Sequence, residues 1–342
     1  MPKGLYKTEN LSDFKPARFT SEGTVTLCSG TIPYRTVCED NVFYNKEGKA
    51  IASIFSYSYF RSDVKDPTDR PVLFGFNGGP GSSSMHVHAG FLGTTRVFYE
   101  ETDRATSLPP YKSIDNPDCL LDVADIVVVD PVATGYGLLL DDSCADQFFT
   151  IEDDAEALLT FISNWLTRYK RWLSPKYLVG ESYGCIRSAV AAGIAGGGGK
   201  KRSYAMAFDG LVLIGNSITT GRYFNRDIPC EQTVLAMPTV AAINWYHNHP
   251  SDQGLEEFIQ EAKQFGDTEY MMALFRGNSL SREEYESVRK RLSYYTGISE
   301  EYLDEHLLRW DEEGAVKQIA RGKGVDFSRY DARMTLPHFT TQ

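Results

Sequence analysis

The run Gly180-Glu181-Ser182-Tyr183-Gly184 has the composition and spacing of a site for covalent catalysis. The apolar residues 177–179 precede it, and the small residues 188–192, which suit a helix, follow it. Strand, G-x-S-x-G and helix together form a nucleophile elbow, a turn so sharp that only small residues fit two positions before and after the serine. Such a turn exposes the serine hydroxyl and directs the next helix N-terminus toward negative charge on a reacting oxygen. The pentapeptide alone also suits an ordinary tight turn, so the prediction that Ser182 is a nucleophile depends on this context.

A second chemical element is the glycine-rich run Asn77-Gly78-Gly79-Pro80-Gly81-Ser82-Ser83, which directly follows a short apolar segment, residues 72–76. It could be a simple turn that joins a strand to a helix. In hydrolases with a nucleophile elbow, however, a turn at this place supplies a backbone N–H to the developing oxyanion, and glycine lets that N–H approach the oxygen closely. We therefore expect the Gly79 and Tyr183 N–H groups to form an oxyanion hole.

Buried strands and helices alternate through the first two thirds of the chain. Short, nearly all-apolar runs of the kind buried on both faces of a sheet occur at residues 72–76, 126–129, 177–179 and 211–214. Residues 51–60 mix small or polar side chains with bulky apolar ones, which predicts antiparallel strand structure with one wetter face. Thr150 can cap a long amphipathic helix whose first turn carries Glu152, Asp153 and Asp154. The pattern predicts a mostly parallel sheet covered by helices.

The character of the sequence changes after about residue 222. Helical patterns occupy residues 238–245, 255–265, 281–292 and 299–310, and Ser281 with Glu284 forms a capping box. No further buried-strand pattern follows. We therefore expect a core at residues 20–221, a helical cap insertion at 222–330 and the start of a return to the core at 331–342.

Three blocks in this order resemble the signature blocks of the serine carboxypeptidase family, peptidase family S10: residues 77–83, Asp130-Pro131-Val132-Ala133-Thr134-Gly135-Tyr136 and residues 180–184. Further segments resemble bacterial members of that family, namely Tyr246-His247-Asn248-His249-Pro250, Tyr295-Thr296-Gly297 and Tyr330-Asp331-Ala332-Arg333. The resemblance implies an α/β-hydrolase fold with a mostly parallel central sheet, flanking helices and a helical cap.

It also implies a serine-type carboxypeptidase that binds peptides with a free C-terminal carboxylate and cleaves them through an acyl-enzyme. Ser182 would be the nucleophile, with Gly79 and Tyr183 as oxyanion donors. The substrate carboxylate would be bound by Asn77, Glu181 and the adjoining Gly78. A protonated Glu181 can donate a hydrogen bond to this carboxylate, whereas an ionised one repels it, so binding should weaken as rising pH ionises Glu181. Local turn capping is the alternative role for Asn77 and Glu181.

The sequence departs from the family pattern at three places. Eukaryotic relatives carry a second recognition glutamate where this chain reads His88-Ala89-Gly90-Phe91-Leu92-Gly93. Ala133 and Cys185 replace customary glycines, and Cys185 is most simply a small buried side chain. Paired-acid recognition of the substrate carboxylate is therefore not expected here.

In this architecture the triad acid and then the histidine follow the serine along the chain. The later histidines, His247, His249, His306 and His338, do not lie in a Gly-His loop after a strand, where the family carries its base. We therefore expect a C-terminally truncated chain that lacks the triad Asp and His and is nearly inactive alone.

The remaining features restrict the function classes. The chain contains 35 Lys and Arg residues and 46 Asp and Glu residues, which gives a net charge of −11. This negative charge disfavours nucleic acids and anionic membranes as partners. Residues 1–10 lack the apolar segment of a secretory signal, so we expect a cytoplasmic protein with free thiols. No metal-ligand spacing or cofactor motif occurs, and we expect neither a metal nor a cofactor. An esterase or acyltransferase of the same fold, or a noncatalytic truncated homologue, are the alternatives.

Overall fold

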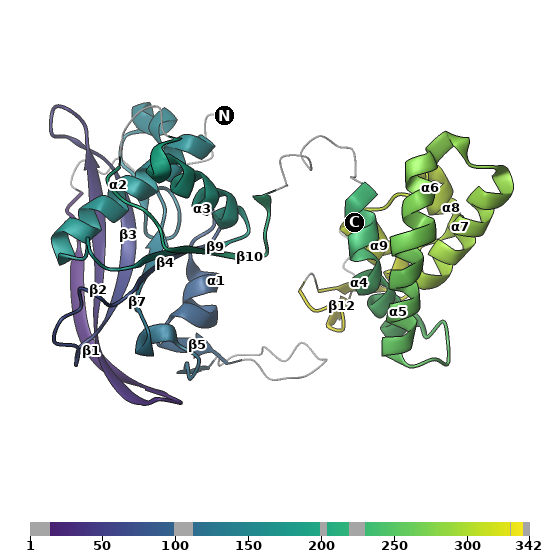
Figure 1. Cartoon of the computed structure of the whole chain (residues 1–342), viewed down its shortest axis with the longest axis horizontal. Helices are drawn as coiled ribbons and strands as arrows, with labels where there is room; N and C mark the ends of the chain where they lie inside the picture. The colour runs from purple at the N-terminus through teal and green to yellow at the C-terminus, as the bar shows by residue number, and fades with distance from the viewer. Residues whose placement is uncertain (1–13, 99–111, 199–203, 219–229, 329, 338–342) are drawn as a thin grey trace. The chain divides into compact units, whose positions relative to one another are not determined.

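The computed structural model describes residues 14–98, 112–198, 204–218, 230–328 and 330–337. These residues divide into two compact units (Figure 1). One is an α/β unit that ends at residue 218, and the other is a helical unit formed by residues 230–337. Each unit has its own apolar core. Within the described part of the chain, no helix combines the length and apolar character needed to cross a membrane.

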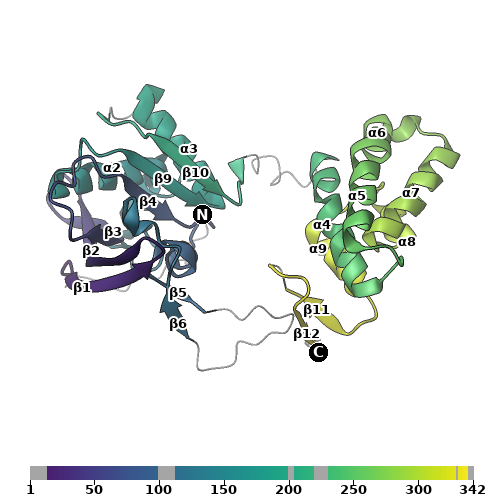
Figure 2. The same cartoon turned by 60° about the horizontal axis from the view of Figure 1, so that its bottom comes forward.

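A mixed sheet forms the centre of the α/β unit (Figure 2). In the described residues its strands follow the order β1-β2-β3-β7-β4-β9-β10, and β8 pairs with β3. The strands are β1 (Arg18–Leu27), β2 (Gly30–Tyr44), β3 (Ala50–Arg61), β4 (Val72–Phe76), β7 (Asp125–Asp130), β8 (Leu138–Leu139), β9 (Lys176–Glu181) and β10 (Gly210–Ile214). β1, β2 and β3 are antiparallel, whereas β7, β4, β9 and β10 run parallel. The predicted α/β-hydrolase class is confirmed, with an antiparallel region joined to the parallel one.

Helices cover both faces of the parallel strands because their side chains alternate between two apolar clusters. Phe74 and Phe76 of β4 face the cluster that contains α2 (Ile151–Tyr169) and α3 (Tyr183–Gly193). Leu73 faces the opposite cluster, with α1 (Met85–Val87), η1 (His88–Leu92) and η2 (Leu120–Asp122). Figure 1 shows α2 and α3 on one side of the sheet and α1 on the other. Thr150 caps α2 as predicted, because its side chain accepts a hydrogen bond from the Asp153 N–H.

The predicted wetter face of residues 51–60 is wrong. Ser53, Ser56 and Ser58 of β3 are all fully buried. Helix α2 lies over this region, and Trp165 donates a hydrogen bond from Nε1 to the Ser58 hydroxyl at 3.0 Å. The serines therefore have polar partners inside the structure rather than contact with solvent.

The prediction of a strand buried on both faces also fails for β10. Leu211 is 38% exposed and Val212 is 45% exposed. Among the described residues β10 is the last strand of the sheet and pairs with β9 alone. A short apolar run is the same for a central strand and an edge strand, so the sequence does not distinguish them.

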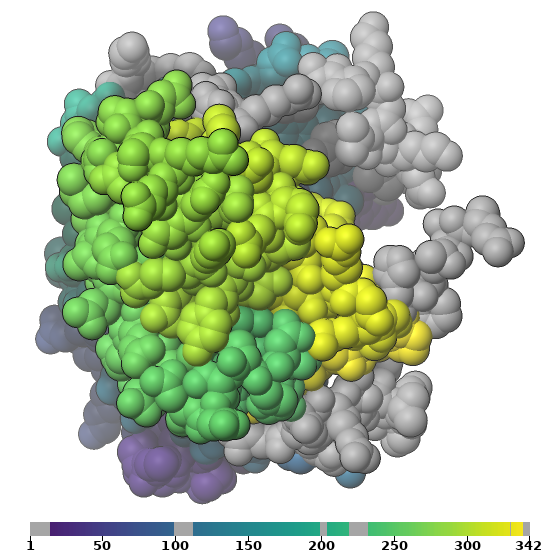
Figure 3. Space-filling model, turned by 90° about the vertical axis from the view of Figure 1, so that its right-hand side faces the viewer, coloured from purple at the N-terminus to yellow at the C-terminus, as the bar shows by residue number. Residues whose placement is uncertain are grey.

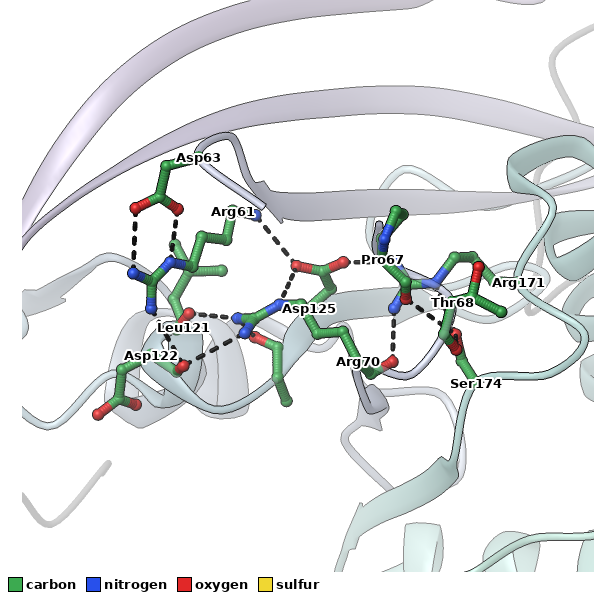
Figure 4. A network of polar contacts seen from close by, with 11 residues as sticks. Arg61, Asp63, Pro67, Thr68, Arg70, Leu121, Asp122, Asp125, Arg171 and Ser174 are labelled. Atoms are coloured by element: carbon green, nitrogen blue, oxygen red, sulfur yellow. Dashed lines mark hydrogen bonds and ion pairs between the residues drawn. The ribbon is translucent and has the colours of Figure 1, made fainter. Parts of the chain in front are cut away.

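A network of buried charges holds the amino-terminal ends of the strands (Figure 4). The carboxylate of Asp125, the first residue of β7, is bound by Arg70 at 2.9 Å and by Arg171. Arg171 also donates to the Arg70 carbonyl and to the Ser174 hydroxyl, each at 2.7 Å. Asp125 and Arg171 are almost completely buried. The two arginines compensate a carboxylate that would otherwise be costly to bury.

The helical unit is built around α4 (Cys230–Asn248), α5 (Leu255–Phe265) and α7 (Arg282–Thr296). Its shorter elements are η6 (Gly266–Tyr270), α6 (Met271–Arg276), η7 (Gly277–Ser279), α8 (Glu300–Glu305), α9 (Glu312–Ala320) and the hairpin of β11 (Val325–Phe327) with β12 (Thr335–Pro337). The capping box of Ser281 and Glu284 is present as predicted. The predicted helix 299–310 ends earlier, at Glu305, because Leu307 and Leu308 both adopt positive φ angles. Figure 3 shows the last described residues, in yellow, lying against the rest of this unit. A capping role for the unit, with boundaries 222–330, stays a prediction.

Two small helical segments and a hairpin complete the α/β unit. They are η3 (Asp142–Gln147), η4 (Ile194–Gly198) and the pair β5 (Thr95–Val97) with β6 (Ser113–Asp115).

Candidate active site

Ser182 lies at a sharp turn between β9 and α3. Its backbone has φ 55° and ψ −122°, a conformation that costs a residue with a side chain about 1–3 kcal/mol. The Ser182 N–H donates to the Ile214 carbonyl at 2.9 Å, which fixes the turn to the end of β10. A Cβ on Gly180 would lie 2.2 Å from the Gly184 carbonyl oxygen, so this position requires glycine. The local backbone therefore has the form of a nucleophile elbow, and the Ser182 side chain is partly exposed.

The glycine turn after β4 lies directly against this elbow. β4 and β9 are parallel neighbours, with Phe76 opposite Gly180, so their carboxyl ends adjoin. A Cβ on Gly78 would lie 2.3 Å from the Tyr183 backbone nitrogen, and such an overlap excludes every residue except glycine. Gly79 follows with φ 107° and is exposed. The structure thus brings the predicted residues of the two motifs into one place.

Asn77 and Glu181 meet across the junction of the two motifs. The Asn77 Nδ2 amide donates to Glu181 Oε2 at 2.8 Å. The other side of the Asn77 side chain is fixed, because Oδ1 accepts from the Val87 N–H at 2.9 Å. Asn77 is buried and Glu181 is partly exposed. The bond to Val87 is a local capping contact, whereas the bond to Glu181 joins the buried Asn77 to a partly exposed carboxyl group next to Ser182.

Asp130, at the carboxyl end of β7, holds the start of the helix after the glycine turn. Its Oδ1 accepts from the Ser84 N–H at 2.7 Å, and its Oδ2 accepts from the Tyr136 N–H at 3.2 Å. Ser84 in turn accepts a hydrogen bond from the Asn77 N–H at 3.1 Å. Burial raises the pKa of Asp130, and the two N–H donors partly offset this effect. In the described residues no cation pairs with Asp130, in contrast to Asp125 at the other end of the same strand.

The departures from the family pattern each have a structural setting. Ala133 adopts φ 60°, a left-handed conformation that glycine takes without strain, which explains the customary glycine at this position. Cys185 is fully buried, as predicted, and its thiol contacts the carbonyls of Gly180 at 3.3 Å and Ile214 at 3.4 Å. Burial raises the pKa of this thiol, so Cys185 stays protonated. The acid-free stretch forms η1, whose Leu92 belongs to the core beneath the sheet.

Two residues of the site were not identified from the sequence. Arg187, in α3, is 2% exposed and donates from Nη1 to the Asn77 carbonyl at 2.8 Å. Its Nε donates to Asp154 Oδ2 at 2.7 Å. The sequence indicates for Asp154 only a favourable charge in the first turn of α2. A lone arginine among the small residues of the predicted helix was the available signal, because a buried arginine requires a partner.

Tyr183 packs beside this pair. Burial, followed by the nearby Asp154 carboxylate, raises the pKa of the Tyr183 phenol to about 12. The phenol is therefore neutral at physiological pH, and the contribution of Tyr183 to acyl transfer is expected from its backbone N–H.

Three of the described histidines have hydrogen-bond partners other than Ser182. His88 Nε2 contacts the Tyr59 hydroxyl at 2.7 Å, and burial lowers the pKa of His88 to about 4. His247 Nε2 donates to the Ala332 carbonyl at 2.7 Å, and His306 Nδ1 contacts the Tyr302 carbonyl at 2.8 Å. His338 lies outside the described residues. Among the described residues, no histidine shares a hydrogen bond with Ser182.

In the part of the chain that the structure describes, no group of three His, Cys, Asp or Glu side chains converges in a way that could bind a metal ion. All five cysteines with described side chains are free thiols.

Two curated plant proteins are similar to part of the chain. Serine carboxypeptidase 1 of Hordeum vulgare is 32% identical over 148 residues, which are 41% of this chain and 28% of the relative. Serine carboxypeptidase-like 5 of Arabidopsis thaliana is 28% identical over 173 residues, which are 48% of this chain and 36% of the relative. The aligned part of this chain thus spans about a third of the length of these curated relatives.

Solved structures that are similar to this chain include Kex1Δp, a prohormone-processing carboxypeptidase from Saccharomyces cerevisiae. The alignment with Kex1Δp has a TM-score of 0.44 and 16% sequence identity, and it covers 76% of this chain and 53% of the Kex1Δp chain. The peroxisomal α-β-hydrolase Lpx1 from the same yeast has a TM-score of 0.30 and 11% identity, and covers 73% of this chain and 62% of its own. The fold class rests on strand order and on the elbow at Ser182 rather than on these scores.

The decisive comparison is at the level of the family. The family model described as "Serine carboxypeptidase" matches residues 43–306. This range includes both motifs, the Asp130 block and much of the helical unit. Since this match extends over more than half of the 342 residues, the chain belongs to the serine carboxypeptidase family.

Proposed function

We propose that the protein is a serine-type carboxypeptidase that removes the C-terminal residue from peptides. Ser182 Oγ attacks the carbonyl carbon of the last peptide bond, and the electron pair of the C=O bond moves to oxygen. Collapse of this intermediate breaks the C–N bond, the departing amine takes up the proton that the Ser182 hydroxyl has lost, and an acyl-enzyme remains on Ser182. Water then hydrolyses the ester and restores the serine.

The oxyanion would be stabilised by two backbone donors, the N–H groups of Gly79 and Tyr183. The support is the approach of Gly78 to the Tyr183 nitrogen, which sets the glycine turn against the elbow. Donors held in this way need no reorganisation when the negative charge appears. Loss of one such donor costs about 3–4 kcal/mol of transition-state stabilisation.

Recognition of the substrate's terminal carboxylate is assigned to Asn77 and Glu181, with the backbone of Gly78 beside them. The observation that carries the proposal is the 2.8 Å hydrogen bond between the side chains of Asn77 and Glu181. A protonated Glu181 would offer one O–H, and the Asn77 amide has two N–H groups, of which one remains for a ligand. Such donors beside Ser182 suit a substrate that ends in a carboxylate.

The protein is further proposed to be a bacterial-type member of the family. The support is the set of segments in the helical unit around His247, Tyr295 and Tyr330 that resemble bacterial members.

The test is hydrolysis of a blocked peptide by the protein, measured by mass spectrometry against the same peptide with a C-terminal amide. The proposal predicts slow loss of the last residue from the free acid over a long incubation, still slower or no cleavage of the amide, and no cleavage by Ser182→Ala. Equal cleavage of both peptides would overturn carboxylate recognition and favour an esterase or acyltransferase.

A further inference from the structure

One buried guanidinium contacts both motifs of the proposed site. Arg187 lies one helical turn after Tyr183 in α3 and is 2% exposed. Its Nη1 donates to the carbonyl oxygen of Asn77 at 2.8 Å. Its guanidinium carbon lies 5.2 Å from the ring centroid of Phe76 and 5.2 Å from that of Tyr183. Arg187 thus connects the end of β4, the glycine turn and the first residue after the nucleophile.

The bond to the Asn77 carbonyl controls the direction of the glycine turn. The Asn77 C=O and the Gly78 N–H belong to one planar peptide group, so a fixed carbonyl fixes the whole group. The same peptide leads into Gly79, whose N–H is one proposed oxyanion donor. Gly78 also lies against the Tyr183 nitrogen, the other proposed donor. The separation of the two donors therefore depends on how firmly this peptide is held.

The Asp154 carboxylate compensates the buried positive charge of Arg187. It lies in the first turn of α2 and accepts from Arg187 Nε at 2.7 Å, with its side chain only 15% exposed. Without this carboxylate, a guanidinium would be buried between two aromatic rings with its charge uncompensated. The ion pair therefore connects α2, and through it the main core, to the glycine turn.

We propose that Arg187 is a positioning residue for acyl transfer: held by Asp154, it fixes the Asn77–Gly78 peptide so that the two oxyanion donors converge. This inference rests on the proposed function for the identity of the donors. It applies equally to peptide and ester substrates, because both reactions develop the same oxyanion.

A specific consequence separates this role from a general contribution to folding. The Asn77 side chain has anchors of its own, the bonds to Val87 and Glu181. Loss of the Arg187 side chain should therefore weaken oxyanion binding much more than carboxylate binding. A residue needed only for folding would affect both sites together.

The experiment compares two probes on the full chain, phenylboronic acid for the oxyanion site and a free-acid peptide for the carboxylate site. With the boronate, a lone pair of Ser182 Oγ fills the empty boron orbital, an O–B bond forms, no bond to boron breaks and the hydroxyl proton passes to the buffer. Affinities are measured by calorimetry for the wild type, Arg187→Ala and Arg187→Lys, and the peptide titrations are done in a Ser182→Ala background, which prevents turnover. Arg168→Ala is the matched control, because Arg168 is a partly exposed arginine of α2 that pairs with Glu39.

We expect Arg187→Ala to weaken boronate binding about tenfold or more, with peptide binding changed less than about threefold. Arg187→Lys should lie between this variant and the wild type, and added guanidinium ion should restore boronate binding to Arg187→Ala. Arg168→Ala should bind both probes like the wild type.

Equal losses for both probes, or a folded Arg187→Ala with unchanged boronate affinity, would overturn the inference. So would a wild type that does not bind the boronate in a Ser182-dependent way. The proposed carboxypeptidase function fails separately, when the free-acid peptide binds no better than its amide while the ranking of the variants for the boronate is unchanged.

Discussion

The side chains of Asn77 and Glu181, 104 residues apart in the sequence, share a 2.8 Å hydrogen bond beside Ser182. Neither residue reaches this position by a flexible loop. Asn77 follows the last residue of β4, and Glu181 ends the neighbouring parallel strand β9. The sheet register therefore sets the distance between the nucleophile and the proposed carboxylate donors.

Glu181→Ala should weaken recognition of the substrate's terminal carboxylate. It removes the side chain that shares a hydrogen bond with Asn77 beside Ser182, and hydrogen bonds to a charged group contribute about 1.5–3 kcal/mol. In a Ser182→Ala background, which prevents turnover, the affinity for a free-acid peptide should fall about tenfold or more, whereas the affinity for its C-terminal amide should change little. Calorimetry with the two peptides measures this difference.

The exposed residue Glu152 provides the control, since Glu152→Ala removes a carboxyl side chain outside the Asn77–Glu181 pair. If Glu181→Ala binds both peptides as its parent does, Glu181 is only a scaffold residue.

Ala133→Gly should stabilise the protein. Ala133 adopts φ 60°, where a Cβ costs about 1–2 kcal/mol, and glycine removes this strain at a smaller cost in unfolded-state entropy. The expected gain in the free energy of unfolding is about 0.5–1 kcal/mol, measured by urea denaturation. Ala236→Gly, inside helix α4, should lower it by about 1 kcal/mol. A destabilised Ala133→Gly protein would show that the backbone at this turn is unstrained.

His88 should make stability depend on pH. Its pKa is lowered from 6.5 to about 4 by burial, so between these values the unfolded chain takes up a proton that the folded chain does not. The free energy of unfolding should therefore fall as the pH decreases from 6.5 to about 4, by up to about 3 kcal/mol from this group. In His88→Gln this part of the slope should disappear, whereas the exposed His86→Gln should keep it. Identical slopes for His88→Gln and the wild type would exclude a buried neutral imidazole.

Asp125→Asn should be strongly destabilising. It leaves the buried Arg171 and the nearly buried Arg70 without their carboxylate, and breaking such a pair costs about 3–5 kcal/mol. Asp63→Asn serves as the control, because Asp63 is an exposed partner of Arg61 in the same region (Figure 4) and should leave the urea midpoint unchanged. Equal midpoints for the two variants would contradict the importance of the buried network.

The sequence predicted the parts of the fold that depend on local patterns. The elbow at Ser182, the cap at Thr150 and the capping box at Ser281 each depend on residues within a few positions, and all three are present. The burial of β10 could not be predicted in this way, because a strand's exposure depends on whether another strand covers it. Its apolar run would look the same at the centre of the sheet.

The same reasoning explains the residues that sequence analysis missed. Asp154 and Arg187 lie 33 residues apart, and each has an ordinary local interpretation as a helix residue. Their significance comes from the packing of α2 against α3, which no local pattern records. Asn77 and Glu181 were identified because their motifs resemble those of a known family, and the contact between them emerges only in the folded chain.

Trapping the acyl-enzyme tests the proposed mechanism at Ser182 most directly. The protein is mixed with a free-acid peptide, quenched in acid after a short delay and digested, and the modified fragment is identified by mass spectrometry. A carboxypeptidase mechanism at Ser182 predicts a mass increase on the fragment that contains Ser182, equal to the mass of the peptide without its last residue less one water, and none in Ser182→Ala. Acylation at another residue, or a Ser182 adduct formed equally from the C-terminal amide, would contradict it.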